Sequence, residues 1–307
     1  MKISSLKNSK VLRSWQLYLM LLLPLVYIII FSYVPMYGTQ LAFRKYSPTA
    51  GISGGEWRGL DYFIRFFSSY QFGRVLTNTL LISAYSLVAG FPVPIILALA
   101  LNAVRSQVYK KTVQLITYLP HFISTVVMAG IIIQVFNTRI GLYGRVFDLF
   151  GGTAPDVLGA PGAFSHLYVW TGIWQSMGWG TIIYLAALSN VPQELHEAAM
   201  IDGATRFQRL IHIDIQAVIP TAVILFIMNA GQLMSVGFEK AYLLQNSLNV
   251  RASELISTYV YKTGLTGSGG GDFSYATAIG LFNSVINLIL LVGVNYIAKT
   301  FGETSLW

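Results

Sequence analysis

Two pairs of amide side chains lie inside long apolar stretches of the sequence. Asn229 and Gln232 are three residues apart, and Asn283 and Asn287 are four apart, so each pair shares one face of a helix. Buried amides of this kind commonly form hydrogen bonds between membrane helices. They can equally line a path for an uncharged solute that carries many hydroxyl groups. The residues alone leave both interpretations open.

Tryptophans accompany a fifth amide in another apolar stretch. Gln175 follows Trp174 directly, and Trp170 and Trp179 are close in sequence. The faces of such rings can pack against the apolar sides of sugar rings. The hypothetical substrate path therefore consists of Trp174, Gln175, Asn229, Gln232, Asn283 and Asn287.

A charged segment, residues 190–214, separates two apolar stretches. Asn190 is a candidate N-cap and Pro192 suits a first helical turn, so we predict a short helix over 192–201. Gly203 can adopt the left-handed conformation that ends such a helix. A second short helix is predicted from the helical spacing of Phe207, Leu210 and Ile211.

The first of these predicted helices has the chemistry of a docking surface. Ala198 and Ala199 permit close approach of another protein, and the carboxylates of Glu197 and Asp202 can pair with arginine or lysine. A plain connector between two membrane helices needs only a few residues. The length of this segment therefore favours a folded element that binds a partner.

The composition places these residues in a membrane protein. The chain has 307 residues, of which 54% are hydrophobic and 10% are charged. A helix needs roughly 20 apolar residues to cross a bilayer. We predict an all-α membrane protein with a short segment 1–14, followed by one transmembrane domain over 15–307. Its six predicted spans are 15–36, 75–101, 112–136, 164–188, 215–235 and 273–298.

Six spans place both termini on the same side of the membrane. The 20 Lys and Arg residues divide equally between the two sets of loops. The N-terminal segment, the loops 102–111 and 189–214 and the C-terminal tail are shorter together, so their positive charge is denser. Positive charge in short segments favours the cytoplasmic side. We therefore expect both termini and the charged segment to be cytoplasmic.

Two outer loops have distinctive patterns. Residues 59–72 carry apolar side chains at helical spacing, which predicts an amphipathic helix at the membrane interface. The glycine-rich run 266–273 predicts a flexible connection before the last span.

Several classes of function lack the residues they need. No Asp, Glu, Lys or Arg lies inside the predicted spans, which argues against an ion-coupled secondary sugar transporter, the main alternative. There is no cysteine, no expected metal site and no clustered acid and base for a membrane enzyme. The net charge of +8 fits anionic lipid better than nucleic acid.

The charged segment resembles a known motif. EAAMIDGATRFQRLIHIDIQAVIP is similar to the EAA motif of permease subunits in bacterial ATP-binding-cassette (ABC) importers, with Gln216 in place of the first closing proline. Motif positions are occupied by Glu197, Ala198, Ala199, Gly203, Ile213 and Pro220. LISAYSLVAGFPVPIILALALN, WTGIWQSMGWGTIIYLAAL, VGFEKAYLLQN, ELISTYVYKTGL and GDFSYATAIGLFNSVINLILL resemble the carbohydrate-importer branch, of the polysaccharide or complex-oligosaccharide type.

This resemblance implies a fold and a set of partners. The fold would be that of a type I ABC importer permease, whose coupling helix over the EAA segment docks on an ATPase through Glu197, Ala198, Ala199, Asp202 and Gly203. The partners would be a second homologous permease, two cytoplasmic ATPase subunits, an extracellular solute-binding lipoprotein, an oligosaccharide and membrane lipid. No phosphate-binding loop occurs in this chain, so ATP and Mg would bind the ATPase subunits. The resemblance implies a location in the bacterial cytoplasmic membrane and no enzymatic activity in this chain.

Overall fold

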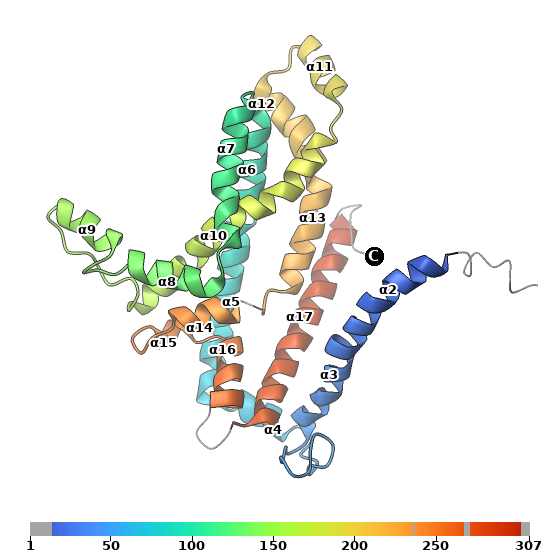
Figure 1. Cartoon of the computed structure of the whole chain (residues 1–307), viewed down its shortest axis with the longest axis vertical. Helices are drawn as coiled ribbons and strands as arrows, with labels where there is room; N and C mark the ends of the chain where they lie inside the picture. Colours follow the sequence, from blue (N-terminus) through green and yellow to red (C-terminus); the bar gives the residue numbers. More distant parts are fainter. Residues whose placement is uncertain (1–13, 236, 267–270, 302–307) are drawn as a thin grey trace, which may run out of the picture.

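The computed structural model describes residues 14–235, 237–266 and 271–301, and all regular structure in these ranges is helical (Figure 1). The N-terminal segment before residue 14, residues 267–270 of the glycine-rich run and the tail after residue 301 lie outside the described residues. Three long helices are continuous in the structure although their geometry changes locally. They are Trp15–Phe43 (α2, η2, α3 and η3), Tyr70–Ala103 (α5 and α6) and Arg206–Gly231 (α12, η5 and α13).

The other helices complete the chain. The remaining long ones are α10 (Pro161–Ser189) and α17 (Phe273–Phe301). The shorter ones are α4 (Asp61–Phe67), α7 (Gln107–Tyr118), η4 (Leu119–Phe122), α8 (Thr125–Val135), α9 (Leu142–Leu149), α11 (Gln193–Ile201), α14 (Phe238–Leu244), α15 (Val250–Ser253), α16 (Ile256–Tyr261) and η6 (Lys262–Thr266).

The third predicted span, 112–136, is wrong as a single straight helix. The helix Gln107–Phe122 and α8 meet at 104°. Ile123 is extended between them, and the hydroxyl of Ser124 accepts a hydrogen bond from the Val127 amide and so caps α8. Pro120 lies in η4, just before the bend. A capping serine so soon after a proline begins a new helix rather than continuing the old one.

By length and apolar composition, the described residues contain four helices able to cross a membrane, or five if the bent pair counts as one span. The predicted count of six is therefore not reproduced. The difference lies in α10, which is 29 residues long but less apolar than the other long helices. Its glycines, serines and tryptophans lower its hydropathy, and these residue types are suited to packing and binding.

α10 is the central helix of the molecule. It packs against α5, α6, α7 and α13, and its buried residues contribute to two apolar clusters. A third cluster joins α4, α5, α16 and α17 around Phe66. The predicted amphipathic helix of the first outer loop is present as α4. Phe66 on α4 is fully buried, so α4 is anchored in this cluster.

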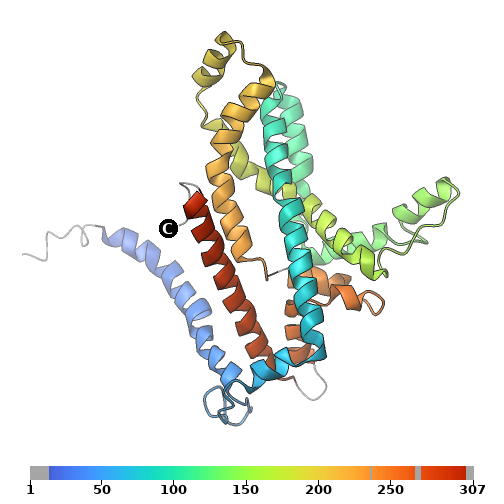
Figure 2. The ribbon, with the colours of Figure 1, turned by 180° about the vertical axis from the view of Figure 1, so that it is seen from behind.

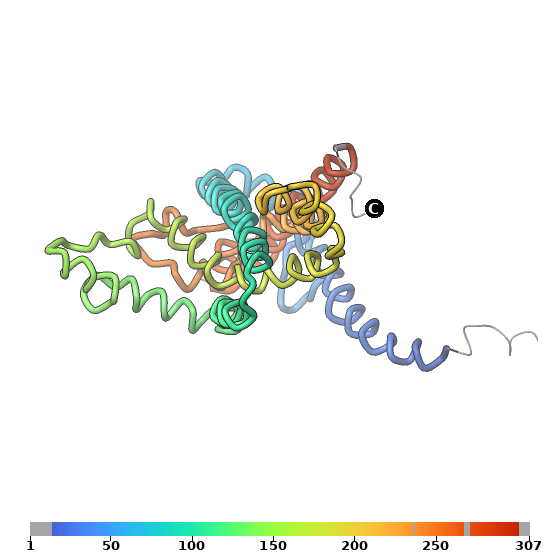
Figure 3. The backbone as a smooth tube through the Cα atoms, turned by 90° about the horizontal axis from the view of Figure 1, so that it is seen from above, coloured from blue at the N-terminus to red at the C-terminus, as the bar shows by residue number. Residues whose placement is uncertain are grey.

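The long helices run between two ends of the molecule. α11 and the turn between α6 and α7 lie at one end, and α4 lies at the other (Figures 1 and 2). α2 and α17 both extend from the α4 end towards the α11 end (Figure 1). Seen along the long axis, α8 and α9 project to one side and α2 to the other (Figure 3).

Candidate coupling surface and substrate path

α11 forms the helix predicted in the charged segment, with a different start. Its N-cap is Pro192, whereas the predicted N-cap, Asn190, ends α10 instead. Asn190 is the C-cap of α10. Pro192 is extended, with φ −61° and ψ 131°, so the chain changes direction between α10 and α11. Glu194 occupies the first turn of α11, where a carboxylate favours the positive end of the helix dipole.

The C-terminus of α11 ends as predicted at Gly203, which has φ +82°. The Gly203 amide donates to the Met200 carbonyl at 3.1 Å, and the Ala204 amide donates to the Ala199 carbonyl at 2.8 Å. This pair of bonds is the Schellman motif, which requires a left-handed residue after the helix. The end of α11 is therefore closed by the backbone itself.

The second predicted short helix is not separate from the fifth span. α12 (Arg206–Arg209) continues through η5 (Leu210–Asp214) into α13 (Ile215–Gly231). Thr205 begins this helix with a capping box, because its hydroxyl accepts from the Gln208 amide and its own amide donates to the Gln208 side chain. No glycine or proline interrupts residues 206–215. Movement at the Thr205 end of this helix can thus reach the fifth span through an unbroken backbone.

α11, which carries Glu197, Ala198 and Ala199, extends beyond the ends of the long helices (Figure 1). Glu197, Ala198 and Asp202 are exposed and Ala199 is half-buried, while Glu197 accepts a hydrogen bond of 2.9 Å from Gln193 on the same helix. Large apolar side chains are exposed beside them, and Ile201 is 87% exposed. An exposed surface that mixes carboxylates with apolar side chains fits a protein partner.

A polar contact joins α11 to the body of the molecule. The Asp214 carboxylate is buried, and its Oδ1 lies 3.3 Å from His196 Nε2 on α11. The Asn102 amide at the end of α6 donates to the same oxygen at 3.4 Å. One buried carboxylate therefore connects α11, the α12–α13 helix and α6.

A cavity of about 540 Å³ lies between α5, α6, α10 and α13. Its lining combines serine, tyrosine, tryptophan and amide side chains with apolar ones and with glycine. Such a surface offers hydrogen bonds to hydroxyl groups together with aromatic faces for sugar rings. Polar lining residues include Ser83, Ser86, Tyr168, Ser176, Trp179, Tyr184, Asn229, Gln232 and Ser235.

Only two residues of the hypothetical substrate path line this cavity. Asn229 and Gln232 line it, whereas Trp174, Gln175, Asn283 and Asn287 do not. Gln175 donates at 3.1 Å to the Ile123 carbonyl at the bend before α8. Asn287 accepts from the Met234 amide at 2.9 Å and donates to Ser235 at 2.8 Å, so it connects α17 to the end of α13.

Residues 90–302 match the protein family described as binding-protein-dependent transport system inner membrane component. The chain belongs to this family. Protein LplB of Bacillus subtilis (strain 168) is 43% identical over 291 residues, which cover 95% of this permease and 91% of that protein. The polygalacturonan/rhamnogalacturonan transport system permease protein YteP of the same organism is 42% identical over 298 residues, or 97% of this permease and 92% of that protein.

A solved structure shares the fold of this permease over nearly its whole length. One chain in the crystal structure of a bacterial alginate ABC transporter, in complex with an alginate pentasaccharide-bound periplasmic protein, matches with a TM-score of 0.87 and 37% sequence identity. The match covers 96% of this permease and 98% of that chain. The permease is therefore a membrane subunit of an ABC importer, and the ion-coupled alternative is excluded. Its family is one of transport proteins.

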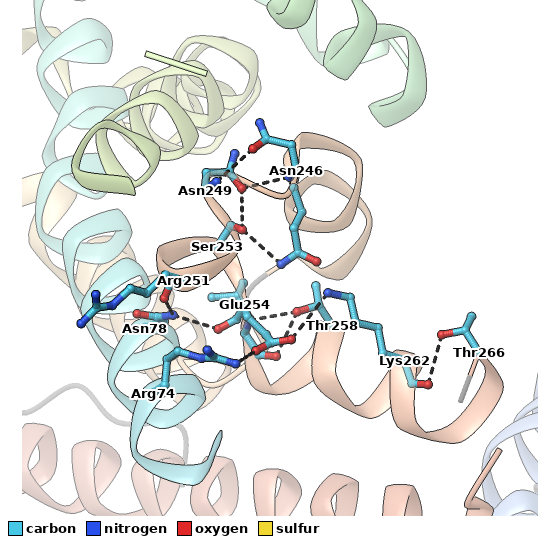
Figure 4. Close-up of polar contacts among 12 residues, drawn as sticks. Arg74, Asn78, Asn246, Asn249, Arg251, Ser253, Glu254, Thr258, Lys262 and Thr266 are labelled. Carbon is cyan, nitrogen blue, oxygen red and sulfur yellow. Dashed lines mark hydrogen bonds and ion pairs between the residues drawn. The ribbon is translucent and has the colours of Figure 1, made fainter. Parts of the chain in front are cut away.

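A group of charged side chains around the buried Glu254 was not predicted from the sequence of the permease. Arg74 on α5 forms an ion pair with the buried Glu254, whose other oxygen lies 3.5 Å from Lys262 Nζ (Figure 4). Asn78 on α5 donates to the carbonyls of Arg251 and Glu254 at 3.0 Å each. All these charges lie outside the predicted spans, so a search for charges within the spans could not find them.

A second missed residue is Lys240 on α14, which is only 8% exposed. It occurs in VGFEKAYLLQN, one of the stretches that resemble carbohydrate importers. Nothing in the pattern of this stretch predicts that the lysine is buried. The adjacent charges of Glu239 and Lys240 are typical of the exposed face of a helix. Only the packing of α14 against α8 and the hydrogen bond to α10 bury this lysine.

Proposed function

We propose that this permease pairs with a second homologous permease to form the path of an oligosaccharide through the bacterial cytoplasmic membrane, and that cytoplasmic ATPase subunits drive it through α11. An extracellular solute-binding lipoprotein delivers the sugar. The supporting observation is α11 itself, a separately capped helix that projects past the long helices and exposes both carboxylates and apolar side chains.

The chemistry of the cavity supports a sugar as the transported solute. Hydroxyl and amide groups alternate with aromatic and apolar surface in its lining. The relatives point the same way, since YteP is named for polygalacturonan and rhamnogalacturonan, and the solved structure is of an alginate transporter. Asn229 and Gln232 are the residues of the hypothetical path best placed to contact the solute.

Mechanical coupling follows from the connections of α11. Closure of the ATPase subunits would displace α11, and the His196–Asp214–Asn102 contact and the continuous α12–α13 helix would pass this displacement to α6 and α13. Both helices border the cavity. The cavity would then open alternately to the two sides of the membrane.

The test is charge reversal on α11 in cells that depend on the importer. Glu197→Lys removes the carboxylate expected to meet a cationic group of the ATPase. We expect uptake of labelled oligogalacturonate to fall by at least about tenfold, the loss typical of a broken charge-assisted contact. Co-purification of the ATPase subunits should fall in parallel.

Lys299→Glu is the matched control, because it reverses an exposed charge at the end of α17, outside α11. It should leave uptake and co-purification near the level of the unmodified protein. Normal uptake by Glu197→Lys, at equal membrane abundance, would refute docking through this residue.

A further inference from the structure

Lys240 carries a buried positive charge. Its Nζ donates to the Tyr168 carbonyl at 2.9 Å and lies 4.9 Å from the centre of the Tyr168 ring. In the described residues, no carboxylate oxygen lies within 4.0 Å of this ammonium group. The lysine is thus stabilised by one carbonyl and one ring face, without a compensating negative charge.

This arrangement is costly for a purely structural contact. Burial lowers the pKa of Lys240 to about 8. At neutral pH, below that value, the group is still mainly charged. A neutral side chain could connect α14 to α10 without the free energy of burying an ammonium group. The retained charge calls for a role that a neutral residue could not fill.

The ammonium group lies next to the cavity. Gly172 lines the cavity, and a Cβ atom at that position would be only 3.2 Å from Lys240 Nζ. Tyr168 and Gly237, which flank the lysine, also line the cavity. Because Gly172 has no side chain, no side-chain atom of that residue lies between Nζ and the cavity. An ammonium group has three N–H donors, and the Tyr168 carbonyl takes one.

The lining itself is uncharged, because Lys240 lies behind it. None of the described residues that line the cavity is Asp, Glu, Lys, Arg or His. A cation behind the wall of an uncharged cavity attracts an anion far more strongly than it attracts a neutral hydroxyl. The attraction is strong because no charged group among the described lining residues competes with the cation.

We propose that Lys240 binds a carboxylate of an acidic oligosaccharide in this cavity and so makes the permease selective for sugars that contain uronic acids. This inference rests on the proposed function, and it specifies the class of sugar. An anionic substrate agrees with one solved structure, which is of an ABC transporter involved in the import of the acidic polysaccharide alginate. One of its chains matches this permease at 38% identity and a TM-score of 0.85.

The first experiment measures access to the lysine directly and needs no ATPase activity. The full-length permease, in nanodiscs with the subunits that co-purify with it, is treated with a low concentration of acetic anhydride at pH 7.5. Mass spectrometry then gives the acetylation of Lys240 relative to the exposed Lys111. Trigalacturonate, a mannuronate trimer and neutral galactotriose are added in parallel.

We expect Lys240 to be acetylated and at least one of the two acidic trimers to reduce its acetylation by about fivefold or more, with galactotriose having little effect. Three results would overturn the inference: no acetylation of Lys240 while Lys111 reacts, equal protection by acidic and neutral trimers, or no protection by either acidic trimer. Because the measurement does not involve ATP, it separates failure of this inference from failure of coupling through α11.

The second experiment tests the effect on transport. Lys240→Met keeps an unbranched side chain and removes the charge, so we expect uptake of the acidic sugar to fall about tenfold, with Lys240→Arg retaining more than Lys240→Met. Lys111→Met removes an exposed charge on α7 and serves as control. Equal uptake by Lys240→Met and the unmodified protein would overturn the inference. If Lys240→Met fails to reach the membrane, the acetylation result decides.

Discussion

Gly203 shows how a single residue shapes the end of α11. Its φ of +82° is a conformation that other residues adopt only at a cost, and a Cβ there would meet no other atom within 4 Å. A substitution by alanine therefore acts through the backbone alone. The two amide hydrogen bonds that close α11 depend on this conformation.

We predict that Gly203→Ala loosens the end of α11 by about 1 kcal/mol, the usual penalty for a left-handed non-glycine residue. Hydrogen exchange of the peptide that contains residues 203 and 204 should become about fivefold faster. Gly162→Ala is the control, because Gly162 has an ordinary helical conformation and open space around it. Unchanged exchange in Gly203→Ala would show that the Schellman bonds do not limit opening.

At the scale of elements, α11 is connected to the helices that follow it or pack beside it by two routes, in addition to its backbone link with α10. The backbone leads through Thr205 into α12 and α13, and the side-chain contact of His196 with Asp214 leads to α6 through Asn102. The backbone route includes the non-helical residues between α11 and α12, which can bend. The side-chain route crosses this hinge, so it should make the coupling stiffer.

We predict that His196→Ala partly uncouples the importer. Losing this contact removes about 1 to 1.5 kcal/mol of interaction between α11 and Asp214. ATP hydrolysis by the reconstituted complex should continue, while sugar transported per ATP falls several-fold. The readout is the ratio of uptake to phosphate release in proteoliposomes.

His212→Ala provides the comparison for this variant. His212 is exposed and bonds only within its own helix, to the Gln208 carbonyl at 3.0 Å. Its removal should leave the ratio intact. A ratio that stays constant in His196→Ala would assign coupling to the backbone route alone.

At the scale of the whole molecule, distant parts of the sequence are joined by buried polar contacts. Arg74 and Glu254 are 180 residues apart and connect α5 to the residue that ends α15. By contrast, the window of highest hydropathy in the Trp15–Phe43 helix has no buried residue. A helix that is apolar and unburied in one chain must be covered by lipid or by another subunit, which agrees with the proposed pairing of two permeases.

We predict that Glu254→Gln destabilises the fold by about 3 kcal/mol, because Arg74 would lose its charged partner in a largely buried site. Thermal unfolding in detergent should shift clearly to lower temperature. Glu56→Gln removes the carboxylate of an exposed pair with Arg58 and should cost under about 1 kcal/mol. Equal shifts in the two variants would refute a structural role for the Arg74–Glu254 pair.

Local patterns in the sequence predict much of this protein. Long apolar stretches, the glycine after α11 and the EAA segment identify most of the membrane helices, the end of α11 and the family. These features depend on residues close together in sequence, so their physical causes act over one or two helical turns. The resemblance carried by the EAA segment is confirmed by the family match, while the roles of its individual residues remain predictions.

Tertiary structure alone decides which polar groups meet. Asn229 and Gln232 line the cavity while Asn287 bonds to the end of α13, although all three have the same signal in sequence. Lys240 looks like a surface residue until α8 and α10 pack around it. Burial and charge pairing depend on contacts between segments far apart in the chain, and hydropathy along the sequence carries no record of those contacts.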